Sequence, residues 1–280
     1  NIVHIITGLN DGGAEVVLYR LCKYDQANKH HVVSLSSSGK YGPMLEVLGV
    51  SVTTLNMSPG QPSPLAFFRL VKLLRLEKPD LVQTWMYHGD LFGGLAARMA
   101  GIRSIVWGIH NSTLEPGKSS KITIWITKIL AKMSWWLPAK IAVGGQQATA
   151  DVHEAQGYDR SKIRFTPSGY DTAEFRPELD PHGEMKASLV LDQFIPLIGT
   201  VGRFDPQKDH VNLLNALTIL RDRGVAFRCV LVGTGLDSSN PEIMEWIAQR
   251  GLADHVLLLG RRNDIPIIMN ALDLHVLPSA

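Results

Sequence analysis

The sequence predicts an α/β protein of two domains, each built on a parallel sheet with helices on both faces. Short apolar runs of strand length alternate with amphipathic helical patterns along the chain, which is typical of parallel sheets. The 280 residues, 45% of them hydrophobic, are enough for two ordinary domains with full cores. The stretch 178–183, with Pro177 before it and Pro181 within it, predicts a linker, so we expect domains at 1–177 and 178–280.

The first domain is expected to begin with a short apolar strand, a glycine-containing turn and a helix. Further strand–helix repeats follow, and each expected strand is a short apolar run bounded by turn residues. Residues 85–90 connect one of these expected strands to a Gly/Ala-rich helix. The expected strands are 1–6, 31–36, 50–55, 81–84, 104–110, 140–143 and 163–165, and the expected helices include 14–28, 65–76, 118–136 and 146–156.

The second domain is expected to repeat the same alternation. Its first strand, 195–201, is an apolar run that contains Pro196 and ends at Gly202. One helix is expected from about Asp209 to 220, and another over 241–250 with a proline in its first turn. The remaining expected strands are 227–232, 255–259 and 273–277.

The junction from Gly202 to Asp209 joins a buried strand to a helix, and open α/β sheets bind ligands at such junctions. Glycine lets the backbone approach a ligand closely. Arg203 offers a planar fork of donors and Lys208 a compact positive charge, which are complementary ways to hold phosphate. Asp209 can cap the helix. The pattern indicates a diphosphate clamp; the alternative is an arginine and a lysine solvated on a loop.

The segment Gly202-Arg203-Phe204-x-x-x-Lys208-Asp209 resembles the G-R-[LF]-x-x-x-K-[GD] loop of retaining glycosyltransferases of family 4. Other segments match in order, so the resemblance covers essentially the whole chain. It implies the GT-B fold of two Rossmann-like domains. It also implies that Arg203 and Lys208 bind the diphosphate of a nucleotide-sugar donor and stabilise the leaving group, since positioned cations act where negative charge develops.

The turn Gly12-Gly13-Ala14-Glu15 is similar to the G-G-[AV]-E start of many members of the family. The resemblance implies that Gly12 and Gly13 lie against the donor phosphates and the acceptor; a flexible turn is the alternative. The spacing is not the G-x-G-x-x-G dinucleotide fingerprint, which disfavours a Rossmann dehydrogenase.

His110 stands where an expected strand opens into a loop, so its side chain can face a cleft. A histidine in this position is often a satisfied structural residue. The resemblance implies a catalytic-site role in which His110 contacts the donor sugar and phosphate. It does not imply a general base, because such enzymes are thought to react on one face with the leaving phosphate assisting. The aromatic strand end at Trp85 either lines an acceptor pocket or packs under a loop.

Two further loops of the second domain resemble donor-binding segments of the family. Gly233-Thr234-Gly235 is similar to its V-G-x-G turn, which implies that Gly233 approaches the nucleotide. Gly260-Arg261-Arg262-Asn263-Asp264-Ile265-Pro266 is similar to its G-x-x-x-D-[IV]-P loop, which implies nucleotide contacts from Arg262, Asp264 and Ile265. A plain turn and solvated arginines are the alternatives.

The helix expected over 118–136 combines apolar, aromatic and basic residues. Ile122, Trp125 and Ile129 belong to an apolar stripe, while Lys121, Lys128 and Lys132 are placed on a different side. This pattern suits a helix at an anionic membrane surface, and an ordinary half-buried helix explains it as well.

Composition limits the other partners and cofactors. A net charge of +2 does not indicate nucleic acid, and no apolar run reaches the roughly 18 residues of a spanning helix. We expect no metal, because there is no Asp-x-Asp motif and no Cys/His cluster has zinc spacing. The two distant cysteines fit a reducing compartment, so we expect a cytoplasmic protein, peripheral on the inner face of the membrane if the basic helix binds it.

The predicted function is transfer of a hexose, with retained configuration, from a nucleotide-diphosphate sugar to a saccharide or lipid-linked acceptor in surface polysaccharide or glycolipid biosynthesis. The alternatives are an epimerase-like GT-B enzyme and a non-catalytic nucleotide-sugar or polysaccharide-binding module. In the family, a pair of glutamates follows the Pro278-Ser279 position. We therefore expect the second domain to be incomplete and these residues alone to have weak or no transferase activity.

Overall fold

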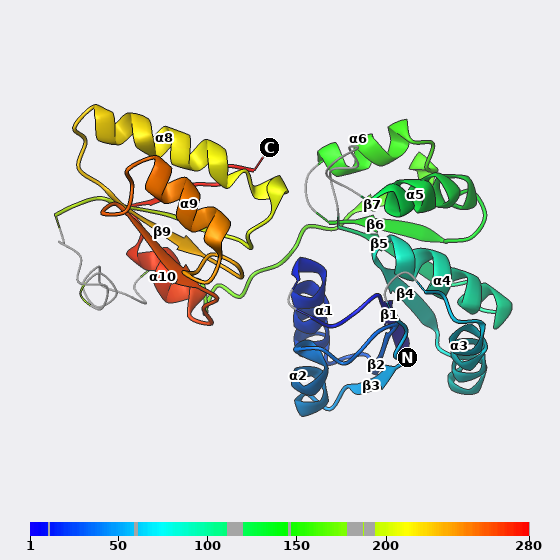
Figure 1. The fold of residues 1–280 in the computed structure, drawn as a ribbon. Helices are drawn as coiled ribbons and strands as arrows, with labels where there is room; N and C mark the ends of the chain where they lie inside the picture. The colour runs from blue at the N-terminus through cyan, green and yellow to red at the C-terminus, as the bar shows by residue number, and fades with distance from the viewer. Residues whose placement is uncertain are drawn as a thin grey trace. The chain divides into compact units, whose positions relative to one another are not determined.

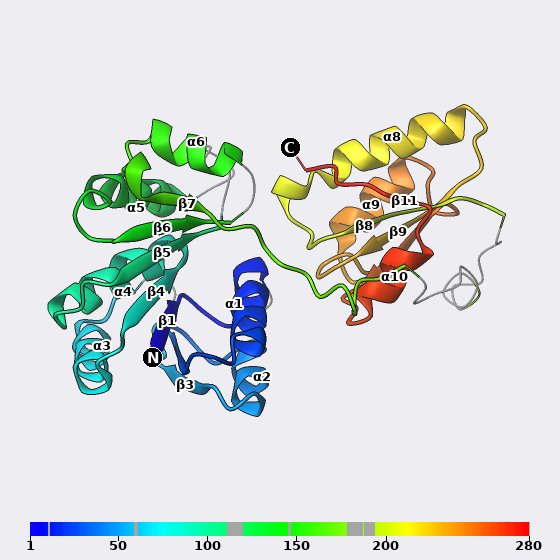
Figure 2. The same cartoon turned by 180° about the vertical axis from the view of Figure 1, so that it is seen from behind.

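The structure is a computed structural model that describes residues 1–10, 12–58, 61–110, 120–144, 147–177, 187 and 194–279. It divides into two compact units, Asn1–Gly169 and Tyr170–Ala280. Each unit is built on a parallel sheet with flanking helices, which confirms the predicted fold class (Figures 1 and 2). The predicted linker at 178–183 lies outside the described residues.

The first unit contains a seven-stranded sheet with the strand order β3-β2-β1-β4-β5-β6-β7. All its strand pairs are parallel. The strands are β1 (Ile2–Ile6), β2 (His30–Ser34), β3 (Ser51–Thr54), β4 (Leu81–Trp85), β5 (Ile105–Ile109), β6 (Lys140–Val143) and β7 (Ile163–Phe165).

Helices cover both faces of this sheet. Helices α1 (Gly13–Tyr24) and α2 (Tyr41–Val47) pack together, and α4 (Met86–Met99) packs between α3 (Pro64–Glu77) and α5 (Lys121–Met133). The two groups lie on opposite sides of the sheet, with α1 and α2 on one side and α3 to α5 on the other (Figure 1). The last helix of the unit is α6 (Gln147–Ala155). From β1 the chain first builds β2 and β3 toward one edge of the sheet and then β4 to β7 toward the other edge. Because the crossovers between parallel strands are right-handed, the two directions place their helices on opposite faces.

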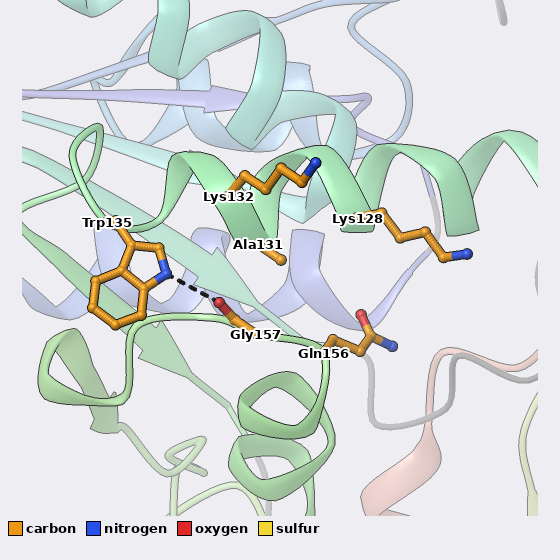
Figure 3. Close-up of a pocket in the computed structure, with 6 residues that line it drawn as sticks. All are labelled: Lys128, Ala131, Lys132, Trp135, Gln156 and Gly157. Atoms are coloured by element: carbon orange, nitrogen blue, oxygen red, sulfur yellow. Dashed lines mark hydrogen bonds between the residues drawn. The ribbon is translucent and has the colours of Figure 1, made fainter.

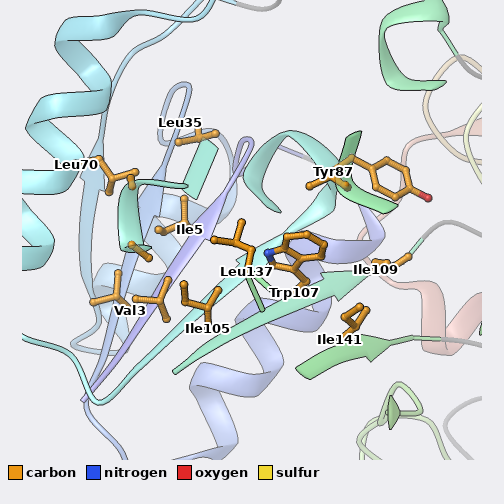
Figure 4. Packing of buried hydrophobic residues seen from close by; sticks show 14 of the residues in the cluster. Val3, Ile5, Leu35, Leu70, Tyr87, Ile105, Trp107, Ile109, Leu137 and Ile141 are labelled. Carbon is orange, nitrogen blue, oxygen red and sulfur yellow. The ribbon is translucent and has the colours of Figure 1, made fainter. Parts of the chain in front are cut away.

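Two hydrophobic cores fill the spaces between the sheet and its helices. One lies under α3 to α5 and contains Ile5, Ile105 and Trp107, all fully buried (Figure 4). The other lies under α1 and α2 and contains Leu18 and Trp85. Because β1 contributes Ile5 to one core and Ile6 to the other, the central strand is buried on both faces, as parallel sheets require.

The second unit contains a four-stranded sheet in the order β10-β9-β8-β11. Its strands are β8 (Leu197–Val201), β9 (Arg228–Val232), β10 (Val256–Gly260) and β11 (Leu274–His275). Among the described residues, its helices are α8 (His210–Asp222), α9 (Pro241–Gln249) and α10 (Ile265–Ala271), and separate hydrophobic clusters lie on the two faces of the sheet. β8 lies between its partners, so the loop after it is flanked by other strand ends.

Three elements show clear differences from the sequence prediction. Helix α1 ends at Tyr24 because Asp25 leaves the helical conformation, with ψ at 79°. Helix α2 was not predicted, since Gly42 and Pro43 interrupt its pattern; proline is tolerated there because it lies in the first turn. β11 covers only Leu274–His275 of the predicted 273–277.

None of the helices in the described part of the chain has the length and apolar character needed to span a membrane.

Candidate functional site

Three loops of the second unit are joined at the carboxyl edge of its sheet. The Gly202 N–H donates to Val232 O at 2.8 Å, and the Phe204 N–H donates to Thr234 O at 2.8 Å. The Gly233 N–H in turn donates to Gly260 O at 2.8 Å. The loops after β8, β9 and β10, which were singled out separately in the sequence, therefore form one backbone assembly where parallel sheets bind ligands.

Glycine is required where the first two loops meet. Gly233 has φ of 150°, and a Cβ atom there would run into the carbonyl group of Gly202. At Gly202 a Cβ atom would make an ordinary van der Waals contact, 3.5 Å from Cε of Lys208. The aliphatic part of the lysine side chain thus runs alongside the glycine, and Lys208 is held close to the strand end.

Arg203 and Lys208 share a carboxylate neighbour, Asp205. The Arg203 Nε donates to Asp205 Oδ2 at 2.9 Å, and Oδ1 accepts from the Gln207 N–H at 3.0 Å. Burial alone would raise the pKa of Asp205, but the Gln207 N–H and the charges of Arg203 and Lys208 hold it below its ordinary value. Both cations therefore lie near one ionised group on the same loop.

The remaining donors of the two cations are available. Within the described residues, neither the Nη groups of Arg203 nor the Lys208 ammonium has a hydrogen-bond partner. The Arg203 side chain is 59% exposed. Because Asp205 fixes only the Nε of Arg203, the outer end of the guanidinium can bind an anion in the bidentate way that phosphate favours.

The start of α8 confirms the predicted helix cap. Lys208 ends a single 3-10 turn, Pro206–Lys208, and Asp209 follows with φ of 46°. The Asp209 Oδ1 accepts from the Asn212 N–H at 3.2 Å, which satisfies one of the free donors at the helix end. The turn brings Lys208 back toward Gly202.

Arg262 and Asp264 bind each other. The Arg262 Nε donates to Asp264 Oδ1 at 2.8 Å and Nη2 donates to Oδ2 at 2.6 Å. The bond from Arg262 is the main reason that the pKa of Asp264 lies below its ordinary value. Ile265 begins α10 directly after this pair. Arg262 thus serves to order the loop, and its charge is already compensated by Asp264.

Gly12, Gly13 and His110 belong to the first unit. Gly12 precedes α1 in an extended conformation, and a side chain there would collide with the Glu15 carboxylate. Gly13 has open space where its Cβ would be. Glu15 in the first turn complements the positive end of the helix.

His110 follows β5 and lies flat on the indole of Trp85, with the ring centroids 5.2 Å apart and the planes at 5°. Gly144 and Gly108 flank its two ring nitrogens, since a Cβ at either would contact them. In the described part of the chain neither nitrogen has a hydrogen-bond partner. Burial lowers the pKa of His110, so the imidazole is neutral at pH 7 and both nitrogens are available to a ligand.

Trp85 is only 2% exposed, so it packs under the site and does not line a pocket for an acceptor. The next residue, Met86, has φ of 65°, a conformation that non-glycine residues rarely adopt and that is often found at functional sites. His88, two residues further, is half-buried, and burial lowers its pKa. The sequence did not indicate that Trp85 and His110 stack, because the contact joins two strands.

A buried group of His4, Cys22 and His30 has ligand atoms within 4.8 Å of one another, the spacing of a metal site. The donor set does not fit a metal. His4 would coordinate through Nε2 and carry its proton on Nδ1, which faces the Trp85 indole N–H at 3.3 Å, and an indole N–H is a donor only. Burial also raises the pKa of Cys22 to about 12, which disfavours a thiolate. The expectation of no metal stays a prediction.

A hollow of about 550 Å³ lies on the first unit between α5 and the end of α6. The Trp135 Nε1 donates to Gly157 O at 3.2 Å across its floor, while the Lys128 and Lys132 side chains extend in different directions (Figure 3). It contains none of the predicted site residues. It is lined by Lys128, Ala131, Lys132, Trp135, Gln156 and Gly157.

The structure shows which residues of α5 face outward, which the sequence left open. Ile122 and Trp125 are 61% and 63% exposed, and they lie on the same outward face as the lysines. The buried face consists of Ile126, Thr127, Leu130 and Ala131. The predicted apolar stripe and basic side therefore overlap, because Ile122 and Trp125 do not pack into the core.

Two Rossmann-like units, one with a cationic loop at the carboxyl edge of its sheet, define the GT-B class of nucleotide-dependent enzymes. Residues 11–174 match the family model Glycosyltransferase Family 4, and residues 183–280 match Glycosyl transferases group 1. The chain therefore belongs to glycosyltransferase family 4, as its motifs predicted.

Similar proteins agree with this assignment. The chain is 28% identical to the putative glycosyltransferase EpsF of Bacillus subtilis over 99% of its own length and 73% of EpsF. It is 30% identical to the UDP-Gal:α-D-GlcNAc-diphosphoundecaprenol α-1,3-galactosyltransferase of Escherichia coli over 75% of the chain and 54% of that enzyme. Its fold is similar to that of Anabaena HepE in complex with UDP, with a TM-score of 0.80 and 22% identity, over 99% of the chain and 74% of HepE.

Proposed function

We propose that this chain binds a nucleotide-diphosphate sugar through its second unit, and that the sugar is transferred with retained configuration to a saccharide or lipid-linked acceptor. The observation that carries the proposal is the pair of cations on the Gly202–Asp209 loop, whose outer donors have no partner among the described residues. The names of the relatives add support, since the E. coli enzyme uses UDP-Gal and acts on a diphosphoundecaprenol-linked sugar.

The chemistry asked of the loop is the stabilisation of a leaving diphosphate. As the bond from the sugar to the phosphate breaks, negative charge develops on the phosphate oxygens, and preoriented cations lower the energy of that state. Arg203 and Lys208 provide the positive charge, and Asp205 aims the guanidinium. His110, neutral and partnerless among the described residues, is proposed to hydrogen-bond the donor sugar or its phosphate.

Calorimetric titration with UDP tests the proposal. We expect Arg203→Ala and Lys208→Ala each to weaken binding about ten- to a hundredfold, since each removes hydrogen bonds to a charged group worth about 1.5–3 kcal/mol. Arg223→Ala, at the other end of α8, is the matched control and should bind UDP normally. Equal binding by all four proteins would reject the clamp.

The product distinguishes the alternatives. An epimerase-like enzyme would alter the UDP-sugar without an acceptor, and a binding module would leave it unchanged. A retaining transferase would give a product with the anomeric configuration of the donor, which NMR coupling constants report. GDP and ADP titrations beside UDP would identify the base.

We further propose that the first unit binds an anionic membrane surface through α5 and the residues after it. Trp125, Trp135 and Trp136 are 63%, 63% and 53% exposed, beside three exposed lysines and no acidic residue on α5. Indole rings favour the membrane interface, and lysines are attracted by anionic headgroups.

Helix α3, in the same layer as α5, adds a second exposed face of similar chemistry. Leu65, Phe68 and Leu76 are 63%, 61% and 73% exposed. Between them lie the basic residues Arg69, Lys72 and Arg75, all exposed. Because α3 and α5 flank α4 on one side of the sheet, both faces can meet one flat surface (Figure 1).

Vesicle flotation tests this part of the proposal. We expect the chain to float with vesicles containing phosphatidylglycerol at low salt, and to float less at high salt because the attraction is screened. The double variant Trp125→Ala, Trp136→Ala should lose most of the binding, whereas Tyr24→Ala, an exposed aromatic change on α1, should not. No flotation of the unaltered chain at low salt would reject the membrane surface.

A further inference from the structure

A chain of buried contacts leads from the centre of the first unit to His110. The Trp85 Nε1 is 3.3 Å from His4 Nδ1, and His4 Nε2 is 2.9 Å from His30 Nδ1. The His30 Nε2 is 3.0 Å from the Asp25 carbonyl oxygen. On its other side, Trp85 carries the stacked imidazole of His110.

The hydrogen-bond partners fix the protons in this chain. The Trp85 indole can only donate, so His4 Nδ1 accepts, and His4 must carry its proton on Nε2. His4 then donates to His30 Nδ1, and His30 donates through Nε2 to the Asp25 carbonyl. The contact geometry thus places one proton on Nε2 of each histidine, and His30 Nε2 also lies 3.5 Å from Asp25 Oδ2. Burial is the main reason that the pKa of His4 falls to about 3, which agrees with this arrangement.

The contacts hold the indole from two sides. Trp85 ends β4 and pairs in register with Ile6 of β1 and Gly108 of β5, which fixes its backbone. The bond to His4, itself fully buried on β1, fixes the rotation of the indole ring about its side-chain bonds. Since β4 lies between β1 and β5, a contact made on β1 is transmitted through Trp85 to the residue that follows β5.

We propose that His4 is a positioning residue for His110: it fixes the plane of the Trp85 indole, and the indole fixes the plane of the His110 imidazole. His110 has no hydrogen bond of its own within the described residues, so the stacking on Trp85 is what orients it. A role of this positioning in catalysis rests on the proposed function, in which His110 contacts the donor. The positioning of His110 by His4 and Trp85 does not depend on that contact.

The experiment compares two substitutions at His4. His4→Asn keeps an oxygen close to the position of Nδ1 and can still accept from Trp85, whereas His4→Phe keeps a ring but offers no acceptor. NMR of the histidine side chains reads the result, with His110→Asn used to assign the signals. In the unaltered chain, we expect the indole to displace the His110 ring protons upfield, and burial holds the pKa of His110 below its ordinary value.

We expect His4→Phe to lose most of the upfield displacement and to return the pKa of His110 toward 6.5, and His4→Asn to restore both. Leu74→Ala, a cavity substitution in the same unit that contacts neither ring, controls for destabilisation and should change neither. If His4→Phe does not fold, His4→Leu takes its place: it also offers Trp85 no acceptor and leaves the indole itself in the protein.

An unchanged His110 spectrum in His4→Phe or His4→Leu would overturn the proposal, as would an equal change in Leu74→Ala. Titration with a UDP-sugar separates this inference from the proposed function. If the spectrum of His110 changes as expected while His110→Ala binds the UDP-sugar normally, the positioning stands and the role of His110 in donor binding is rejected.

Discussion

Asp205 determines what the two cations of the second unit can offer a ligand. Its carboxylate takes the inner nitrogen of Arg203 and one backbone N–H, and it stays ionised because the pKa is held low. The Asp205 carboxylate therefore orients the Arg203 guanidinium and also neutralises part of the positive charge of that group. In the sequence it stands at a variable position of the loop motif, so its role could not be read from the resemblance.

His4 makes the first unit sensitive to acid. Its folded-state pKa is about 3 against 6.5 for an exposed histidine, so between these values the unfolded chain binds a proton that the folded chain does not. The stability contributed by neutral His4 is complete above pH 6.5 and is lost as the pH falls toward 3.

We predict that the free energy of unfolding falls on acidification by up to about 1.4 kcal/mol per pH unit more in the unaltered chain than in His4→Asn. Urea denaturation at intervals between pH 7 and pH 4 measures this. Other histidines with lowered pKa are present in both proteins, so the difference isolates His4. Parallel pH profiles for the two proteins would contradict the prediction.

Among the elements, the loop after β9 depends most on its backbone conformation. Gly233 combines φ of 150° with contact against the Gly202 carbonyl, and it bonds to Gly260 on the far side. A side chain there would separate the loops that carry Arg203 and Arg262.

We predict that Gly233→Ala lowers the free energy of unfolding by roughly 3 kcal/mol or more, because strain and overpacking add. Gly224→Ala, with φ of 71° but nothing within 4 Å of its Cβ, should cost only about 1 kcal/mol of strain. Hydrogen exchange of β8, β9 and β10 measures both variants. Equal costs would show that the contact with Gly202 is unimportant.

Most elements were predictable, because each is encoded by a local pattern. The strands of both units are apolar runs between turn residues, and α9 carries its asparagine cap and first-turn proline in the sequence. Helix α2 was missed because glycine and proline in its first turn look like a loop. The sequence did not indicate which apolar residues of α5 remain exposed, because periodicity alone does not show which of them find a partner.

Across the whole molecule, site residues that lie together in one loop after a strand were predictable from the sequence. Contacts between side chains of different strands were not. The Gly202–Asp209 loop is contiguous, so its chemistry is visible in the sequence. The bonds from His4 to His30 and from Trp85 to His4 join residues 26 and 81 positions apart, and no local pattern connects them. The parallel order of the sheet makes them neighbours.

A crystal structure with UDP bound is the most direct measurement. We predict phosphate oxygens within about 2.7–3.2 Å of both the Arg203 Nη groups and the Lys208 Nζ, with the Asp205 bond to Nε kept. A pyrophosphate bound elsewhere, or held by neither cation, would contradict the assignment of this loop as the diphosphate clamp.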